Sequence, residues 1–193
     1  MPTIKAFRMD GLGNKFVIVD RRKDFVNITK EKIIHLGNLK SFHRDIGFDQ
    51  IIFIEKEVDK AFPITIFNSD GSEVSACGNG SRCIAYLLGK DLNTKTVKLK
   101  TNNRLLDAKI VGDLSVELST GKPIFEWDKI PLSKKIDHGD VTLNINDKIF
   151  TNGFSLNVGN PHIIFFVKDC FKYDLNILGP KIENHELFPE KTN

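Results

Sequence analysis

The residues best suited to chemistry lie between positions 67 and 83, where the sequence reads FNSDGSEVSACGNGSRC. A predicted strand ends there in a polar turn, and Cys77, followed by Gly78, Asn79 and Gly80, opens a predicted helix. The first backbone N–H groups of a helix have no intrahelical partner and its dipole is positive there, which favours a thiolate at Cys77. These N–H groups can also bind a carboxylate, and glycine lets a ligand approach the backbone. The pattern therefore predicts that Cys77 removes a proton from the carbon next to a bound carboxylate.

The other two cysteines are weaker candidates. Cys83 falls well inside the same predicted helix, where a buried packing role is the simpler interpretation. Cys170 lies in a polar run and is interpreted as incidental. Three cysteines without CxxC pairs predict neither a disulfide framework nor a metal site. A zinc module that uses Cys77, Cys83 and nearby histidines is thus the weakest functional alternative.

Two glycine-bearing polar turns, DGLGN at residues 10–14 and VGNPH at residues 158–162, stand out elsewhere. Each taken alone is most simply a turn. Asn14, Asn68, Asn79 and Asn160 nevertheless all end a predicted strand or lie in a turn, so they could converge on one polar ligand. Because an amide group both donates and accepts hydrogen bonds, such a pocket suits a zwitterion.

Short strands and two helices are expected to position these residues over positions 1–120. The first helix is expected to run from an N-cap at Thr29 to about Leu39 as a packing element, and the second from about Asn79 to Leu88 with Gly89 just after it. The Gly-Pro pair near residue 123 predicts a boundary between domains 1–120 and 121–193. Period-2 alternation and β-branched residues predict strands at 4–8, 16–20, 50–54, 64–68, 97–101, 105–111, 115–118, 141–145, 148–156 and 162–167. In the second domain a short helix is expected at 173–178 and another after Pro180.

Composition places the chain among ordinary globular proteins. Its 193 residues are 40% hydrophobic, and 28 Lys and Arg against 25 Asp and Glu are scattered along the chain, unlike the basic stripe of a nucleic-acid-binding protein. The first residues do not resemble a signal peptide, and no run approaches the roughly 18 apolar residues that span a membrane. We expect a cytoplasmic protein that binds a small molecule and neither nucleic acid nor membrane.

Taken together, these stretches resemble the diaminopimelate epimerase family. MDGLGNKF at residues 9–16 is similar to its N-terminal signature, and FNSDGSEV at 67–74 with ACGNGSRC at 76–83 resembles its first active-site motif. NVGNPH at 157–162, LGP at 178–180 and LFPEKTN at 187–193 match later landmarks in order. The resemblance implies an α+β (α/β) fold of two pseudo-symmetric, strand-rich, barrel-like domains, each around a central helix. It also allows a homodimer.

In that family two cysteines invert the α-carbon of diaminopimelate, interconverting its LL and meso forms for lysine and peptidoglycan precursor synthesis. One removes the α-proton as a thiolate and the other delivers a proton to the opposite face, with no pyridoxal phosphate, other cofactor or metal. By this resemblance Cys77 is one of the pair, and the N–H groups of Gly78 and Asn79 hold the reacting carboxylate. The substrate is implied to be lined by Asn14, by Asn68, Asn160 and Asn193 towards its distal end, and by Gln50 and His162 near the reacting centre.

The resemblance places the second cysteine motif after Asn193, so we expect an incomplete second domain and impaired epimerisation by these 193 residues. Without a central helix in that domain, the apolar faces of residues 141–145 and 163–167 are expected to be exposed, with aggregation, partial disorder or a complementing chain as the result. Two alternatives stay open. The chain is a related proline-racemase-like or phenazine-type isomerase, or it is a non-catalytic fragment that binds a ligand or a partner chain.

Overall fold

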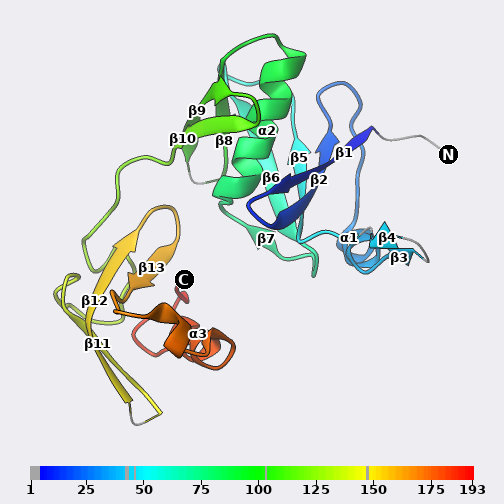
Figure 1. Cartoon of the computed structure of the whole chain (residues 1–193). Coiled ribbons are helices and arrows are strands. Elements are labelled where there is room, and N and C mark those ends of the chain that lie inside the picture. Colours follow the sequence, from blue (N-terminus) through cyan, green and yellow to red (C-terminus); the bar gives the residue numbers. More distant parts are fainter. Residues whose placement is uncertain (1–4, 42–43, 46, 103, 147) are drawn as a thin grey trace. The chain divides into compact units, whose positions relative to one another are not determined.

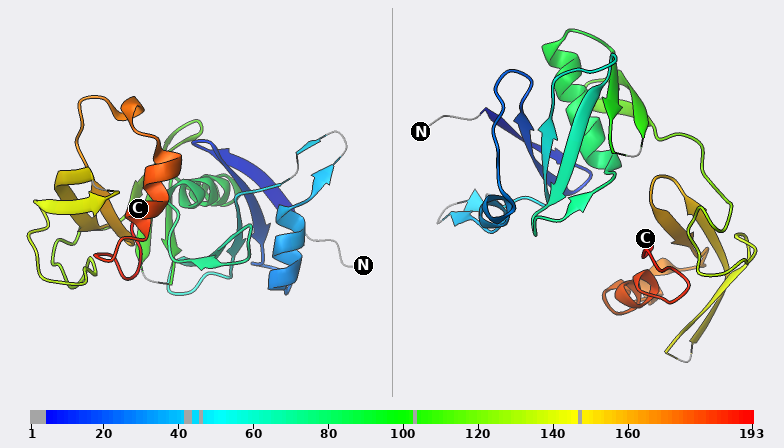
Figure 2. Two further views of the ribbon diagram at one scale, coloured as in Figure 1. Left: turned by 90° about the horizontal axis from the view of Figure 1, so that it is seen from below. Right: turned by 180° about the vertical axis from the view of Figure 1, so that it is seen from behind.

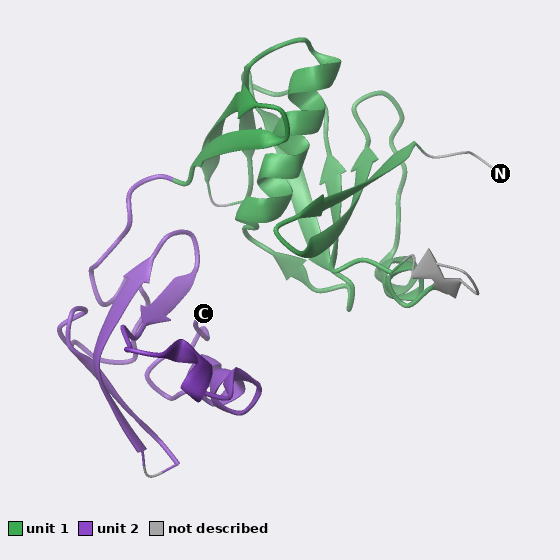
Figure 3. Ribbon diagram, in the orientation of Figure 1, with its two compact units in different colours: residues 1–120 green, residues 121–193 purple. Residues whose placement is uncertain are grey.

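The computed structural model describes residues 5–41, 44–45, 47–102, 104–146 and 148–193. The chain forms two units, residues 1–120 and residues 121–193 (Figures 1 and 3). Each unit has its own buried apolar core.

Unit 1 is built on one curled sheet with the strand order β1-β2-β5-β6-β8-β9-β10, and β7 pairs with β6 at its side. The β2–β5 and β6–β8 pairs are parallel and the others are antiparallel. A separate two-stranded ribbon joins β3 to β4. The strands are β1 (Ala6–Gly11), β2 (Asn14–Asp20), β3 (Lys40–Ser41), β4 (Arg44–Asp45), β5 (Gln50–Ile54), β6 (Phe62–Asn68), β7 (Glu73–Val74), β8 (Thr96–Lys100), β9 (Leu105–Gly112) and β10 (Ser115–Ser119).

The apolar run of β5 shows why this strand lies in the middle of the sheet. Ile52 and Ile54 belong to the main cluster of unit 1, whereas Ile51 and Phe53 belong to a second cluster on the other side, and all four are almost fully buried. Because successive side chains of a strand point to opposite faces, a continuous apolar run is what burial on both faces requires.

Helix α2 (Gly78–Asp91) lies inside the curve of this sheet (Figures 1 and 2). It contacts β1 and β2 from one end of the sheet and β8, β9 and β10 from the other. Ile84, Ala85 and Leu88 on its buried face have no solvent exposure. A strand-rich sheet around a central helix is the architecture implied by the family resemblance, so the predicted fold class is confirmed.

The predicted helix ends were partly wrong. Helix α1 (Lys30–Gly37) begins as expected, with the Thr29 hydroxyl accepting the Lys32 N–H at 3.4 Å, and packs through Ile33, but it stops before Leu39. Helix α2 continues through Gly89 to Asp91. Gly89 is buried, and a Cβ added to it would lie 2.9 Å from the Thr94 carbonyl oxygen and 2.6 Å from Ile110 Cδ1. The glycine is therefore explained by close packing rather than by helix termination.

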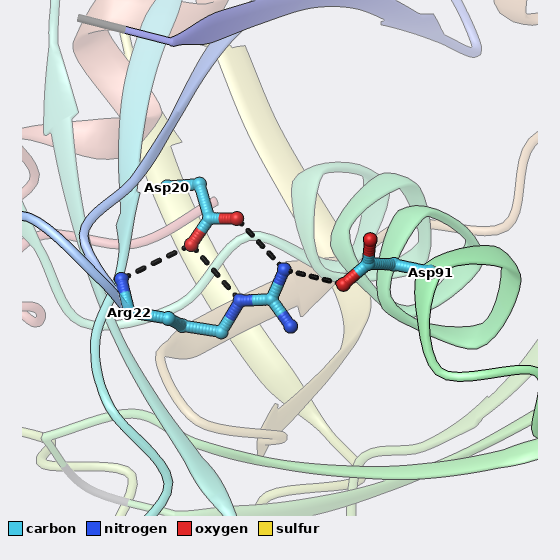
Figure 4. A network of polar contacts seen from close by, with 3 residues as sticks. All are labelled: Asp20, Arg22 and Asp91. Atoms are coloured by element: carbon cyan, nitrogen blue, oxygen red, sulfur yellow. Dashed lines mark hydrogen bonds and ion pairs between the residues drawn. The ribbon is translucent and has the colours of Figure 1, made fainter.

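An ion-pair network ties the C-terminal end of α2 to the end of β2 (Figure 4). The Arg22 guanidinium donates to both carboxylate oxygens of Asp20, at 2.9 and 2.7 Å, and its Nη2 also donates to Asp91 at 2.7 Å. The hydrogen bonds from Arg22 lower the pKa of the Asp20 carboxyl below its ordinary value. The network thus holds in place the helix that carries Cys77 at its other end.

Unit 2 contains an antiparallel sheet of β11 (Val141–Ile145), β12 (Lys148–Asn157) and β13 (Pro161–Ile164). A 3-10 turn at Cys170–Lys172 and helix α3 (Leu175–Glu183) follow. The strand expected at 162–167 thus stops at Ile164. The two helices expected around Pro180 are one, because α3 runs through this proline and closes when the Asn184 N–H donates to the Pro180 carbonyl at 3.2 Å.

The expectation that residues 141–145 expose an apolar face was wrong. Val141, Leu143 and Ile145 are at most 4% exposed, because Leu187, Phe188 and Ile130 pack against them in the core of unit 2. The segment 163–167 is mixed: Ile163 is buried, but Ile164 and Val167 are about two-fifths exposed and Phe166 is 85% exposed.

Candidate active site

Cys77 is the N-cap residue of α2. Its backbone is extended (φ −149°, ψ 105°), and its Sγ accepts the Gly80 N–H at 3.3 Å. The first hydrogen bond of the helix runs from the Ser81 N–H to the Cys77 carbonyl at 2.9 Å, so the N–H groups of Gly78 and Asn79 precede it. Cys77 is partly exposed, and its sulfur lies at the N-terminal end of the helix.

The tight turn between β1 and β2 brings Asn14 to this helix end. The turn residues Leu12 and Gly13 both have positive φ, 49° and 90°, as a two-residue hairpin of this twist requires. The Asn79 amide then donates to Asn14 Oδ1 at 2.9 Å. Gly11 lies close against α2, since a Cβ there would lie 3.0 Å from Cys83 Sγ. Asn14, Cys77, Gly78 and Asn79 therefore form one group.

Gln50 and Asn68 form a second group, at the end of the sheet where β2 and β5 begin and β6 ends. They face each other in the β5–β6 register, and Gln50 Nε2 donates to Asn68 Oδ1 at 3.0 Å. Asn68 in turn donates to the Ser72 hydroxyl at 3.0 Å. Asp49 connects the two groups, because its backbone N–H donates to the Lys15 carbonyl and its carbonyl accepts the Ser69 N–H, both at 2.9 Å.

The other three predicted site residues belong to unit 2 and lie close to one another. His162 Nδ1 is 3.1 Å from the Asn160 carbonyl oxygen. The Asn193 N–H donates to the Pro161 carbonyl at 3.0 Å, and the Ile163 N–H donates to the Asn193 carbonyl at 2.8 Å. Asn193 also lines a mainly apolar groove of about 490 Å³ in this unit, together with Phe150 and Tyr173 among others.

The two remaining cysteines have contrasting surroundings. Cys83 is 7% exposed within the main cluster of unit 1, and burial raises the pKa of its thiol. The packing role predicted for it agrees with this position. Cys170 is exposed and begins the 3-10 turn of unit 2.

A family model for diaminopimelate epimerase matches residues 6–126, which contain the Cys77 helix start and both groups of amides. The chain belongs to the diaminopimelate epimerase family. It is 49% identical over 193 residues to the diaminopimelate epimerase of Pelagibacter ubique, a match that covers 98% of this chain and 69% of that protein. It is 39% identical over 192 residues to that of a Wolbachia strain from Brugia malayi, covering 96% and 68%. The chain thus spans about two thirds of the length of these epimerases.

Solved structures share the epimerase fold at low sequence identity. A hydroxyproline epimerase from Agrobacterium vitis has a TM-score of 0.55 at 13% identity, covering 94% of this chain and 54% of that one. A "predicted epimerase" from Pseudomonas aeruginosa has a TM-score of 0.54 at 16% identity, covering 86% and 60%. At these identities the likeness concerns the fold alone.

The described residues contain neither a membrane-spanning helix nor a metal-ligand cluster. No helix among them is long and apolar enough to cross a membrane. Nor do three or more His, Cys, Asp or Glu side chains within the described ranges gather into a group that could hold a metal ion.

Two polar residues next to this epimerase-family site were not singled out from the sequence. Arg82 donates to Asn79 Oδ1, and Asp49 Oδ2 accepts the Lys15 N–H at 2.8 Å and the Asn14 amide at 3.4 Å. Arg82 had a signal, since it lies in the cysteine motif three residues after Asn79, on the same helix face. Asp49 had none beyond its position just before an apolar strand.

Proposed function

We propose that this chain supplies the Cys77 side of a diaminopimelate epimerase site. The observation that carries the proposal is the position of Cys77 as the N-cap of α2, with its sulfur accepting the Gly80 N–H. The N–H groups of Gly78 and Asn79, at the same helix start, hold the reacting α-carboxylate, which presents the α-carbon to the sulfur. The named epimerases to which the chain is 39–49% identical support this substrate.

This geometry determines where the α-proton and the electron pair of its bond go. The Cys77 thiolate takes the α-proton and becomes a thiol, and the electron pair of the broken C–H bond moves onto the carboxylate held at the helix N-terminus. Return of that proton restores the same epimer. Inversion needs an acid on the opposite face of the α-carbon. Neither remaining cysteine is assigned to this role, because Cys83 is buried and the exposed Cys170 does not resemble the family's second cysteine motif.

The polar side chains are proposed to bind the rest of the substrate. Asn14 and Asn79 lie beside Cys77, and Gln50 near the reacting centre is supported by its buried Oε1, which has no hydrogen-bond partner among the described residues. Asn68 and the unit 2 residues Asn160 and Asn193 are assigned to the distal end, and His162 to the reacting centre. The cofactor-free reaction, a cytoplasmic location and a homodimer stay predictions.

Deuterium exchange tests the proposal. The 193-residue chain is incubated with each diaminopimelate epimer in D₂O, and deuterium at the α-carbon is followed by mass spectrometry and NMR. We expect exchange mainly with retention of configuration, and Cys77→Ala should lower its rate by about 10²-fold or more. Cys170→Ser is the matched control and should leave the rate unchanged. Exchange that persists in Cys77→Ala would remove Cys77 from this role.

A second candidate is a chain that binds diaminopimelate without turning it over. It rests on the same amide groups, since Asn14, Asn79, Gln50 and Asn68 can bind a ligand whether or not a proton is then moved. Calorimetry with diaminopimelate, run beside the exchange assay, separates the two, since heat of binding without deuterium uptake selects this candidate.

A further inference from the structure

Four side chains of the candidate site are joined by consecutive hydrogen bonds, with a cation at one end and an anion at the other. Arg82 Nη2 donates to Asn79 Oδ1, Asn79 Nδ2 donates to Asn14 Oδ1 at 2.9 Å, and Asn14 Nδ2 donates to Asp49 Oδ2 at 3.4 Å. We call these four residues the polar network. It joins α2, the start of β2 and the segment before β5, which are distant in the sequence.

The charges at the two ends fix the direction of both amides. A guanidinium group only donates hydrogen bonds and a carboxylate only accepts them. Turning the Asn79 amide over would set its NH₂ group against Arg82 and its oxygen against Asn14 Oδ1. Turning the Asn14 amide over would likewise set its oxygen against Asp49. Each reversal loses two hydrogen bonds, so one orientation of the pair is strongly favoured.

Local contacts hold Arg82 and Asp49 in the positions from which they orient the two amides. Arg82 lies one turn into α2, and a Cβ on Gly78 would be 3.6 Å from its Nη1, so the guanidinium lies along the first turn. Asp49 is exposed, but its Oδ2 also accepts the Lys15 N–H at 2.8 Å, which anchors the carboxylate.

We propose that Arg82 and Asp49 are positioning residues that orient Asn79 and Asn14 for substrate binding. This inference rests on the proposed function, in which both asparagines contact the substrate. Arg82 and Asp49 act through them by setting which amide atoms face the ligand. An account based on charge alone differs in one respect: it expects loss of the Asp49 carboxylate to strengthen binding of the substrate's carboxylates, whereas loss of orientation weakens it.

Calorimetric titration with diaminopimelate distinguishes the two accounts. Arg82→Met removes the donor and the charge, and its Kd should rise about tenfold, as loss of one oriented polar contact predicts. Arg82→Lys keeps a donor and should recover most of the affinity. Asp49→Ala should also weaken binding several-fold despite the loss of a negative charge. Lys90→Met, which removes an exposed cation from the last turn of the same helix, is the matched control and should bind normally.

Side-chain amide NMR gives a readout that needs no ligand. In ¹⁵N–¹H spectra, Arg82→Met should shift the Asn14 amide as well as that of Asn79, and Asp49→Ala should shift the Asn79 amide as well as that of Asn14. Lys90→Met should shift neither. If the wild-type protein fails to bind diaminopimelate, the proposed function fails. The spectra still decide whether Arg82 and Asp49 orient the two asparagine amides. Unchanged spectra, or an Asp49→Ala variant that binds as tightly as wild type, would overturn the inference.

Discussion

The network of Asp20, Arg22 and Asp91 offers a quantitative test of what holds α2 in place. Arg22→Met removes the guanidinium and keeps an unbranched side chain of similar reach. The variant loses the paired hydrogen bonds to Asp20, whose side chain is 15% exposed, and the bond to Asp91, whose side chain is 51% exposed. These exposures set how much each contact contributes.

The Asp20 contact should dominate. A charge-assisted hydrogen-bonded pair in a mostly buried setting contributes about 1.5–3 kcal/mol, whereas a half-exposed ion pair contributes about 0–1 kcal/mol. Arg22→Met should therefore lower the free energy of unfolding of unit 1 by about 2–3 kcal/mol. Asp91→Asn should lower it by less than about 1 kcal/mol.

The effect should depend on pH in one direction. Arg22 lowers the pKa of folded Asp20 below its ordinary value of 3.8. A carboxyl whose pKa is lower in the folded state stabilises the protein above its unfolded pKa, and this contribution is lost as the pH falls through the folded pKa. The difference between wild type and Arg22→Met should be complete at pH 7 and should shrink below about pH 4.

Two internal probes separate the units in a urea titration. Cys83 is buried in unit 1, so its alkylation in short pulses reports the unfolding of that unit, and fluorescence of the single tryptophan, Trp127, reports unit 2. Only the Cys83 transition should move in Arg22→Met. Lys98→Met, which breaks an exposed pair with Asp107, is the control and should change stability by less than about 0.5 kcal/mol. An equally small effect of Arg22→Met, or one independent of pH, would refute the reasoning.

Other predictions concern single side chains. Leu12 is 85% exposed at φ 49°, so Leu12→Asn, which suits this turn, should stabilise unit 1 by about 0.5–1 kcal/mol in the same urea titration. Leu88 is fully buried, so Leu88→Ala should destabilise unit 1 by about 2–5 kcal/mol by that assay. In a Cys170→Ser background, Cys77 should react with iodoacetamide at least about tenfold faster than Cys83 in the folded protein, as peptide mass spectrometry would measure. Equal rates would contradict the assigned environments.

Local patterns in the sequence were enough to predict most strands of the fold. β5 and β11 have the bounds predicted for them, because each alternation or apolar run ends where burial ends. Gly89 and Pro180 misled the prediction of helix ends. Glycine often ends a helix and proline often begins one, but packing against Thr94 and Ile110 accounts for Gly89, and α3 runs through Pro180 to Glu183. Tertiary packing thus outweighed the usual preference of glycine and proline for helix ends.

The contacts between the candidate site residues could not be predicted from the sequence. The amides of Asn14 and Asn79 meet across 65 residues of sequence, and Gln50 meets Asn68 only through the β5–β6 register. Neither contact leaves a trace in local spacing. Asp49 was missed for the same reason, since its hydrogen bonds with Lys15 and Asn14 span 34 and 35 residues of sequence.

The position of α2 between early and late strands also affects when the site forms during synthesis. β1 and β2 are made before the helix, but β8, β9 and β10, which cover its other side, are completed only at Ser119. At about 5–20 residues per second, the roughly 40 residues that follow Cys77 take about 2–8 s to make. For that time the face of α2 that these late strands cover has no partner from unit 1. The helix start that carries Cys77 therefore takes its final place only after Ser119 has been made.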